Sequence, residues 1–360
     1  MKFGIFYELQ LPRPWEVDSE HKLYKNALSQ CELADRLGFD YAWEVEHHFL
    51  EEYSHSPPPE VFLGMGESAS ITELEPFNVD MENKRAIWED AVRALIPMFR
   101  DGGSSYDGPH FKFPLRNVLP KPLQKPHPPL WVACSQLQTI EMAGRRGMGA
   151  LGFQFVSADA AHAWVHAYYN AFTTQLDKLE DYQTNPNIAL VSYFMCARTD
   201  EEARRRAEGS TFFQFALQFY GASSGRKRPE PGTVNMWDEY TRWKAANPDQ
   251  AARSLAGGLI GSPDTIRKKL RKFKESNIDQ VILLNQAGKT THEHICESLE
   301  LFAREGMPEF HADEPAHQEW KRGVLAGEIK LEELDTTPFK DRFRPGMITV
   351  KPRGAATAAE

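Results

Sequence analysis

The sequence predicts an α/β barrel of parallel strands, and three observations support this fold class. The chain has 360 residues, a length that suits a single TIM-type (β/α)₈ barrel with insertions. Short apolar runs typical of buried strands alternate with amphipathic segments typical of helices, and this order favours parallel strands joined by crossover helices. No G-x-G-x-x-G pattern follows the first strand, which disfavours a dinucleotide-binding sheet.

The individual elements follow from apolar periodicity and from start and stop signals. Gly38 marks the end of the first helix, and Ser262 and Pro263 mark the N-cap and first residue of a later helix. The Gly- and Pro-rich stretch 101–129 is predicted to be a long irregular excursion. Strands are expected at 2–9, 40–48, 130–135, 149–155, 188–197 and 279–285, and helices at 21–37, 82–99, 139–147, 158–179, 200–220, from 263, and at 291–304.

Composition excludes several classes of protein. The net charge of −9 offers no attraction to a polyanion, so we expect no nucleic-acid partner. No apolar run approaches the roughly 18 residues that span a bilayer, and the first residues lack the apolar stretch of a signal peptide. Cys31, Cys134, Cys196 and Cys296 are far apart and fit reduced thiols in a cytoplasmic protein.

Two adjacent histidines, His47 and His48, close the second predicted strand. Because side chains alternate along a strand, the two imidazoles face opposite ways and cannot easily bind one metal ion. The carboxyl end of a strand is the catalytic end of such a barrel, so one imidazole is a candidate acid or base. The alternative is a pair of polar residues that closes the strand. Glu46 beside them either orients an imidazole or is solvated.

Two further stretches are candidate anion sites. The glycine turn GMGES at 64–68 would present backbone N–H groups to an anion, or is an ordinary strand-to-loop turn. Ser135 ends a predicted strand and Thr139 lies near the start of the next helix, so hydroxyls and free helix N–H groups would form a phosphate cup. Thr139 acting only as a helix cap is the alternative. His292 and His294 have metal-like spacing but point apart on a helix, so we expect no metal site there.

Six stretches, taken in order, resemble one known family. Together they resemble the bacterial luciferase-like, flavin-dependent monooxygenases over residues 1–308. The resemblance implies a (β/α)₈ barrel that binds reduced FMN, or the deazaflavin F420, at the carboxyl ends of its strands. FMN-dependent members take reduced flavin from a separate reductase and, with O₂, form a peroxyflavin that oxidises a small organic substrate. The stretches are MKFGIFYE, EVEHHF, GES with FNVDMENKRAIWEDA, GPHFKFP, PPLWVACS and GSPDTIRKKLRKFKESNIDQVILLNQAG.

The resemblance also implies which residues form the site. His47 would be the catalytic histidine, and the flavin phosphate would lie near Ser135 and Thr139. Glu67 stands where the luciferase proper has an arginine, so backbone groups would have to hold the phosphate, because a carboxylate cannot pair with it. The full predicted cofactor-binding set is Glu46, Gly66, Ser68, Ala69, Ser135, Gln138 and Thr139, and no metal ligand is expected.

The chain departs from the family between the histidines and the glycine turn. His48 and Gly66 are only 18 positions apart, so relative to the family on the order of forty residues, about one βαβ unit, are missing here. The run 61–66 resembles either the end of the family's second helix or its fourth strand. As a strand beside 41–48 it would partly close the gap. We expect an open barrel of about six or seven strands, with weakened flavin binding.

Two alternatives to a monooxygenase stay open. One is an F420-dependent hydride-transfer oxidoreductase on the same fold, and the other is a catalytically impaired flavin-binding or structural relative. The expected partners are a small organic substrate, O₂ and a flavin reductase, and a homodimer is a further expectation. Residues 1–308 are expected to form the barrel domain, and 309–360 a C-terminal extension whose last residues are disordered.

Overall fold

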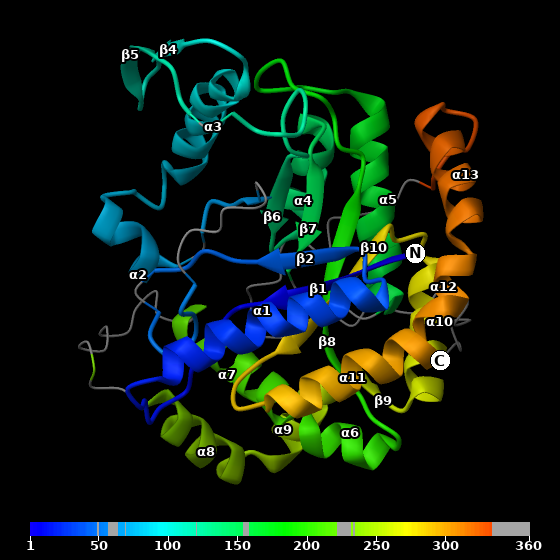
Figure 1. Ribbon diagram of the computed structural model, residues 1–360. Helices are drawn as coiled ribbons and strands as arrows, with labels where there is room; N and C mark the ends of the chain where they lie inside the picture. Colours follow the sequence, from blue (N-terminus) through cyan, green and yellow to red (C-terminus); the bar gives the residue numbers. More distant parts are fainter. Residues whose placement is uncertain are drawn as a thin grey trace, which may run out of the picture.

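The computed structural model describes residues 1–48, 50–56, 64–68, 70–119, 121–153, 158–221, 232 and 235–332. Within these residues, helices and strands alternate along much of the chain (Figure 1). The strands are β1 Lys2–Tyr7, β2 Tyr41–Glu44, β3 Gly64–Met65, β4 Ser104–Asp107, β5 Lys112–Arg116, β6 Trp131–Cys134, β7 Gly149–Gly152, β8 Ile188–Cys196, β9 Leu259–Gly261 and β10 Gln280–Gln286.

The helices are α1 Ser19–Leu37, α2 Ile71–Leu74, α3 Lys84–Leu95, α4 Leu137–Arg146, α5 Ala158–Thr174, α6 Asp200–Arg206, α7 Glu208–Gly221, α8 Met236–Ala246, α9 Pro248–Ala256, α10 Pro263–Glu275, α11 His292–Glu305, α12 Met307–Ala312 and α13 Glu314–Leu325. Short 3₁₀ turns follow α2 and α3, at Glu75–Phe77 and Ile96–Phe99. None of the described helices combines the length and the apolar character that crossing a bilayer requires.

One parallel sheet organises the molecule and forms a half-barrel with its helices (Figure 1). Its strands follow the order β2-β1-β10-β8-β7-β6-β3, and β9 pairs with the end of β8. β1 lies between its two neighbours, so Phe6 is in register with both Leu284 of β10 and Trp43 of β2. Because all these pairings are parallel, the carboxyl ends of the strands meet at one edge. The predicted class, an incomplete α/β barrel, is confirmed.

Both faces of the sheet are buried. On β1, Phe3, Ile5 and Tyr7 join one apolar cluster with the outer helices, whereas Phe6 joins a second cluster that includes Trp43. Such alternation is expected of a strand that is covered on both sides. On the outer side α1 packs beside α11, and α4 packs beside α5 (Figure 1).

The half-barrel is open between β2 and β3. Among the described strands, β2 pairs only with β1, and β3 pairs only with β6, through Gly64 and Met65. Of the two alternatives for 61–66, the described part is a strand. This strand does not lie beside β2, because Gly64 and Met65 pair with the edge of β6 instead. The rings of Trp43 and Trp131 meet edge to face, with centroids 5.3 Å apart. Aromatic packing, not a backbone ladder, thus joins β2 to β6.

The second strand is shorter than its sequence suggests. β2 ends at Glu44, so His47 and His48 lie in the loop beyond the strand and not on it. The reason lies in the neighbouring strand. β1 ends at Tyr7, and Leu9 adopts a left-handed conformation with φ 54°, so β2 has no ladder partner to continue along.

The helix signals are confirmed, and the stretch 101–129 needs a correction. Gly38 ends α1 at φ 83°, and the Ser262 side chain accepts the N–H of Thr265 at the start of α10. The stretch 101–129 is not wholly irregular, because β4 and β5 form an antiparallel hairpin within it. Backbone hydrogen bonds across the hairpin satisfy polar groups that an irregular excursion would leave to water.

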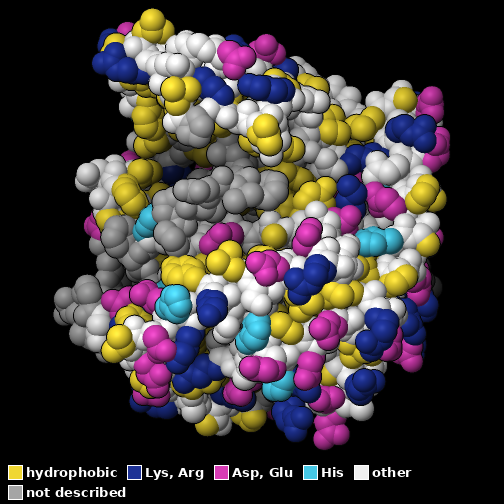
Figure 2. All heavy atoms as spheres, in the orientation of Figure 1, with side chains coloured by type: hydrophobic (Ala, Val, Ile, Leu, Met, Phe, Trp, Pro, Cys, Tyr) yellow, Lys and Arg dark blue, Asp and Glu magenta, His cyan; other side chains and the backbone are white. Residues whose placement is uncertain are grey.

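This hairpin and α3 form an arm that projects from the half-barrel (Figure 1). Asp90 of α3 anchors the arm by accepting the Tyr106 hydroxyl and the N–H groups of His110 and Phe111. Apolar side chains gather on the arm in the space-filling view (Figure 2). The exposed apolar residues of the stretch 101–129 are Phe111, Leu115, Val118, Leu119 and Leu123.

At the amino ends of the strands, a buried network of charged and polar side chains holds helices against the sheet. Asp279, directly before β10, accepts hydrogen bonds from Tyr169, His317 and Lys321 at 2.7, 2.8 and 3.0 Å. His317 and Lys321 belong to α13, so this network holds a helix of the predicted C-terminal extension against the sheet. Residues 333–360, the rest of that extension, lie outside the described residues.

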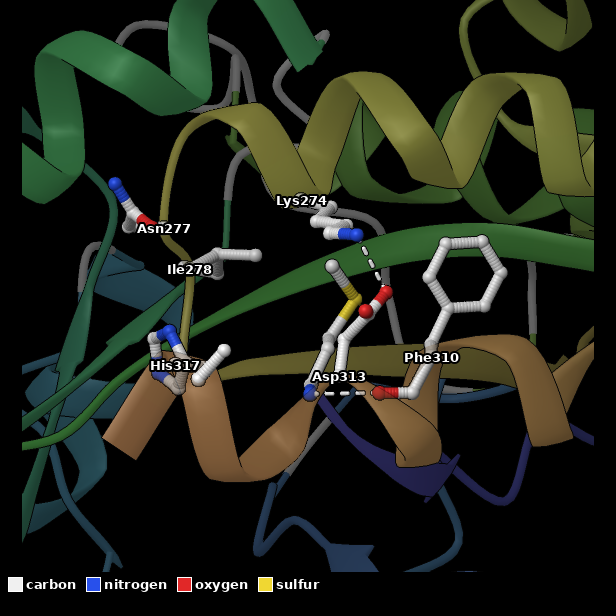
Figure 3. A pocket seen from close by; sticks show the side chains of 8 residues that line it. Lys274, Asn277, Ile278, Phe310, Asp313 and His317 are labelled. Atoms are coloured by element: carbon white, nitrogen blue, oxygen red, sulfur yellow. Dashed lines mark hydrogen bonds and ion pairs between the residues drawn. The ribbon is translucent and has the colours of Figure 1, made fainter. Parts of the chain in front are cut away.

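A small cavity of about 180 Å³ lies beside His317, at the same amino end (Figure 3). Met1, Ile278 and Phe310 contribute its apolar lining, and the ion pair between Lys274 and Asp313 stands at its rim. It lies at the end of the sheet opposite the carboxyl ends of the strands. The amino end of a barrel ordinarily serves stability, so we assign this cavity no chemistry.

The open edge leads to a prediction about stability. Inserting a family-typical strand–helix–strand unit between Ser56 and Gly64 should raise the melting temperature, because it would pair the free edges of β2 and β3 and cover apolar surface. Differential scanning calorimetry measures the effect.

The matched control is a Gly/Ser linker of the same length at the same point. A flexible linker only lengthens the loop, which costs little and stabilises nothing. Equal melting temperatures for the two insertions would mean that the half-barrel gains nothing from the extra unit.

Candidate active site

His47 lies between two carboxylates at the carboxyl end of the sheet. Its Nδ1 is 2.6 Å from Oε1 of Glu73, and its Nε2 is 3.1 Å from Oε1 of Glu8. The imidazole also packs edge to face on Tyr53, with ring centroids 5.7 Å apart. Its side chain is 27% exposed, so part of the ring remains open to a ligand. Of the two adjacent histidines, His47 is the one flanked by two carboxylates and therefore the better candidate for proton transfer.

Glu8 is a fully buried carboxylic acid. It follows β1 directly, two residues after Phe6, on the carboxyl edge of the sheet. Within the described part of the chain neither of its oxygens accepts a hydrogen bond of good geometry, although the contact with His47 is within ion-pair distance. Burial raises the pKa of Glu8 to about 7, against the opposing pull of the His47 charge.

The pKa of His47 is raised, whereas the pKa of its partner Glu73 is lowered. Burial alone would lower the pKa of His47, but the carboxylates of Glu8, Glu73 and Glu46 outweigh it and raise the pKa to about 9. Burial alone would raise the pKa of Glu73, but hydrogen bonds from His47 and Ser68 hold it below the usual value. His47 is therefore an imidazolium and Glu73 a carboxylate at neutral pH.

Glu73 also connects the histidine to the glycine turn. While Oε1 faces His47, Oε2 accepts the Ser68 hydroxyl at 2.7 Å. The short helix α2 follows the turn and supplies Glu73, so the carboxylate can contact both sides. Ser68 itself adopts φ 51°, and its oxygen also accepts the N–H of Ser70. Two motifs that are separate in the sequence thus share one carboxylate.

His48 and Glu46 lie apart from this cluster. His48 Nε2 contacts Glu46 Oε1 at 2.7 Å, and both side chains are exposed. The ring of His48 packs edge to face on Phe77. The two adjacent imidazoles do face different partners, as expected, although they do so in a loop. Glu46 acts on His47 only through its charge, and its place in a cofactor site stays a prediction.

The glycine turn lies beside the predicted phosphate cup. β3 pairs with β6 in register, and a Cβ built on Gly66 would lie 3.5 Å from Cβ of Ala133. Glu67, the next residue, forms an ion pair with Arg85 of α3. Lys84 donates to the backbone oxygen of Ser68. Two cations therefore lie near the turn. The charges of Arg85 and Glu67 also act on the pKa of Cys134, where β6 ends.

The cup itself is the start of α4. Ser135 and Thr139 are half-buried and Gln138 is exposed. Gln136 is the N-cap, in extended conformation, and its side chain makes no cap hydrogen bond. The N–H of Thr139 bonds to the Gln136 oxygen, so the N–H groups of the first turn before it are the ones left to an anion. Ala69, the last of the predicted cofactor residues, lies outside the described residues.

Glu8, Glu73 and Arg85 were not predicted from the sequence as site residues. A signal existed for two of them. Glu8 is a charged residue at the end of an otherwise apolar strand, and Ser70 with Glu73 has the S-x-x-E spacing of a helix start. No local pattern marks Arg85, because its partner Glu67 lies 18 positions earlier. In the described part of the chain, no group of three His, Cys, Asp or Glu side chains is placed to hold a metal ion.

Comparison with known proteins identifies the family. The sequence model of the family described as luciferase-like monooxygenase matches residues 60–280, more than half of the chain. The chain belongs to the luciferase-like monooxygenase family. A curated relative is the oxygenase component of flavin-dependent trigonelline monooxygenase from Acinetobacter baylyi. It is 22% identical over 360 aligned residues, which cover 86% of this chain and 96% of the relative.

Solved structures of several enzymes share the fold. The monooxygenase RslO1 from Streptomyces bottropensis superposes with a TM-score of 0.66 at 20% identity, over 86% of this chain and all of that one. The oxygenating constituent of 3,6-diketocamphane monooxygenase from Pseudomonas putida, solved with FMN, gives 0.62 at 15% identity, with coverages of 86% and 98%. The F420-dependent tetrahydromethanopterin reductase of Methanopyrus kandleri gives 0.56 at 14%, with coverages of 86% and 99%.

The environment of His47 predicts a pH-dependent stability. Because its folded pKa is raised from 6.5 to about 9, the charge interactions of His47 stabilise the fold fully below pH 6.5 and are lost as the pH rises through 9. The free-energy difference between wild type and His47→Gln, from urea unfolding, should fall by on the order of 3 kcal/mol across this window.

His48→Gln is the matched control for that series. Its surface pair with Glu46 is worth little, so this variant should differ from wild type by less than about 1 kcal/mol at every pH. A His47→Gln difference that stays flat from pH 6 to 10 would contradict the assigned charge state.

Proposed function

We propose that this protein is a flavin-dependent monooxygenase that uses reduced FMN and O₂ to oxidise a small organic substrate. The observation that carries the proposal is the shared position of the Gly66–Ser68 turn. On one side Ser68 shares Glu73 with His47, and on the other side Gly66 lies against β6, which ends at Cys134, directly before Ser135. A proton-handling group and a phosphate cup therefore belong to one continuous site at the carboxyl edge of the sheet.

The residues of the cup suit a flavin phosphate. Ser135 and Thr139 supply hydroxyls beside the uncapped start of α4, and such helix starts bind phosphate through free N–H groups and the helix dipole. Arg85 would supply the positive charge. Its guanidinium now pairs with Glu67 and would pair with the phosphate instead when the flavin binds. This answers the difficulty of a carboxylate at position 67, since the cation comes from α3 and not from the turn.

The rest of the site suits an oxidation that must exclude water. Reduced flavin, when bound, supplies the electrons that activate O₂. His47 would hold or give a proton at the substrate, and Tyr53 and Phe213 would shield that region, their rings being 5.5 Å apart and fully buried or nearly so. The flavin-dependent oxygenase component from Acinetobacter baylyi and the FMN-bound camphane enzyme support this choice of cofactor.

A second candidate is an F420-dependent hydride-transfer oxidoreductase. The fold shared with the reductase of Methanopyrus kandleri supports it. A third is an impaired flavin-binding relative, which the opening between β2 and β3 favours. Binding of reduced FMN with consumption of O₂ distinguishes the first proposal from both.

The proposal includes partners and a location. A separate flavin reductase would supply reduced FMN, because the relative from Acinetobacter baylyi is named as an oxygenase component. A homodimer is part of the proposal, with the apolar arm formed by α3, β4 and β5 as the candidate contact, and light scattering tests it. The cytoplasm is the proposed location, since the four cysteines are free.

The role of His47 predicts a separation of turnover from binding. His47→Ala should abolish substrate oxidation while flavin affinity stays within a few-fold, because the side chain handles protons and does not hold the phosphate. His48→Ala, the neighbouring control, should retain most activity. Equal losses in the two variants, with folding intact by circular dichroism, would refute the assignment.

The role of the cup predicts a selective loss of phosphate binding. Removing both hydroxyls, in Ser135→Ala with Thr139→Ala, should weaken FMN by tenfold or more, since each bond to a charged group is worth roughly 1.5–3 kcal/mol. Riboflavin, which lacks the phosphate, is the control ligand and should bind almost unchanged. Calorimetric titration that finds equal weakening of both ligands would place the phosphate elsewhere.

A further inference from the structure

We propose that Glu8 is a positioning residue of the site, which together with Glu73 holds His47 as an imidazolium and so makes the histidine a proton donor and not a base. This inference deepens the function proposed above and rests on it for the identity of the reaction. Glu8 lies at the end of β1 and was not among the residues predicted to form the site. The arrangement of the three side chains carries it.

Both ring nitrogens of His47 lie close to carboxylates. Glu73 holds Nδ1 at 2.6 Å from one side, and Glu8 lies 3.1 Å from Nε2 on the other. Both nitrogens therefore face carboxylate oxygens, which accept hydrogen bonds and donate none when ionised. Glu73 is ionised at neutral pH, and Glu8 becomes ionised as the pH rises through about 7. Above that pH both nitrogens face ionised carboxylates and carry protons, and an imidazole with two N–H groups is a cation. A neutral, basic His47 would place a nitrogen lone pair against a carboxylate.

The charges nearest the ring of His47 come from three different segments of the chain. Glu8 comes from the end of β1, Glu73 from α2 and Glu46 from the loop that carries His47. Tyr53, from the following loop, has its pKa raised well above the usual value by burial and by the Glu8 charge, so it stays neutral. The charged groups with the largest effect on the pKa of His47 are thus acidic, and they favour its protonated form.

Glu8 is completely buried. Removing a carboxylate from water costs several kcal/mol unless a partner compensates, and His47 is the partner that this carboxylate has. An apolar residue at this place would stabilise the fold better. Glu8 therefore fits a role in setting the charge of His47 better than a role in stability.

The proton at Nε2 is the one available for transfer. Glu73 keeps the Nδ1 proton in a short hydrogen bond, whereas Glu8 makes a longer contact without good hydrogen-bond geometry. In the transfer, the Nε2–H bond breaks and its electron pair stays on the ring, which becomes a neutral imidazole. An O–H bond forms on an anionic oxygen of the substrate, which loses one negative charge.

The experiment is a histidine titration by NMR on ¹⁵N-labelled protein, with His47 assigned by the His47→Gln variant. In wild type the midpoint of His47 should lie near 9. In Glu8→Gln, which keeps the shape and removes the charge, the midpoint should fall by about one pH unit or more. Glu20→Gln is the matched control, because Glu20 contacts a different histidine, His55, and should leave the midpoint of His47 unchanged.

A midpoint of His47 that is the same in wild type and in Glu8→Gln would overturn the proposal. If Glu8→Gln does not fold, Glu73→Gln replaces it and should lower the midpoint in the same direction. An unchanged midpoint there would overturn the proposal equally.

The pH profile of turnover separates this proposal from the function itself. With His47 as donor, the rate should fall on the alkaline side near pH 9, and this limb should move to lower pH in Glu8→Gln and return part of the way in Glu8→Asp. A rate that rises with pH through this range would overturn the donor role. If no flavin-dependent turnover occurs at all, the proposed function fails, while the NMR titration still decides the charge state.

Discussion

The parallel pairing of β1 with both β2 and β10 is the constraint on which the site depends. It places the first strand in the middle of the sheet and gives β1, β2 and β10 a common carboxyl edge. Glu8 directly follows β1 at this edge. The loop after β2 places Nε2 of His47 3.1 Å from the Glu8 carboxylate. The side chains are 39 positions apart in sequence, and only this register brings them together.

The gap in the barrel has a limited effect on the described site. Between β2 and β3 the sheet is open, yet the contact of Trp43 with Trp131 packs the inner cluster together, and Glu73 ties the histidine loop to the glycine turn. The site is thus held together across the open edge by side-chain contacts and not by a backbone ladder. Side-chain contacts fix geometry less rigidly than paired strands, which is a physical reason to expect weak cofactor binding.

Much of the fold could be predicted from the sequence, because apolar periodicity, Gly38 and Ser262 are local signals that tertiary structure did not override. The family also followed from motifs. The motifs singled out His47, which lies between Glu8 and Glu73, and its catalytic role stays a prediction. The pairing of β3 with β6, the hairpin within 101–129 and the contacts of Glu8, Glu73 and Arg85 could not be predicted, because they depend on strand register and on partners distant in sequence. The cofactor-binding residues stay predictions until a ligand is measured.

The most direct test of the account is calorimetric titration of the purified, folded protein with FMN and, separately, with riboflavin. The account predicts saturable binding of one FMN per chain, and weaker binding of riboflavin because the cup at Ser135 and Thr139 then has no phosphate to hold. Competition by F420 would favour the hydride-transfer alternative. A protein that melts cooperatively but binds no FMN would contradict the central claim, and would leave a member of the family that has kept the half-barrel without its cofactor.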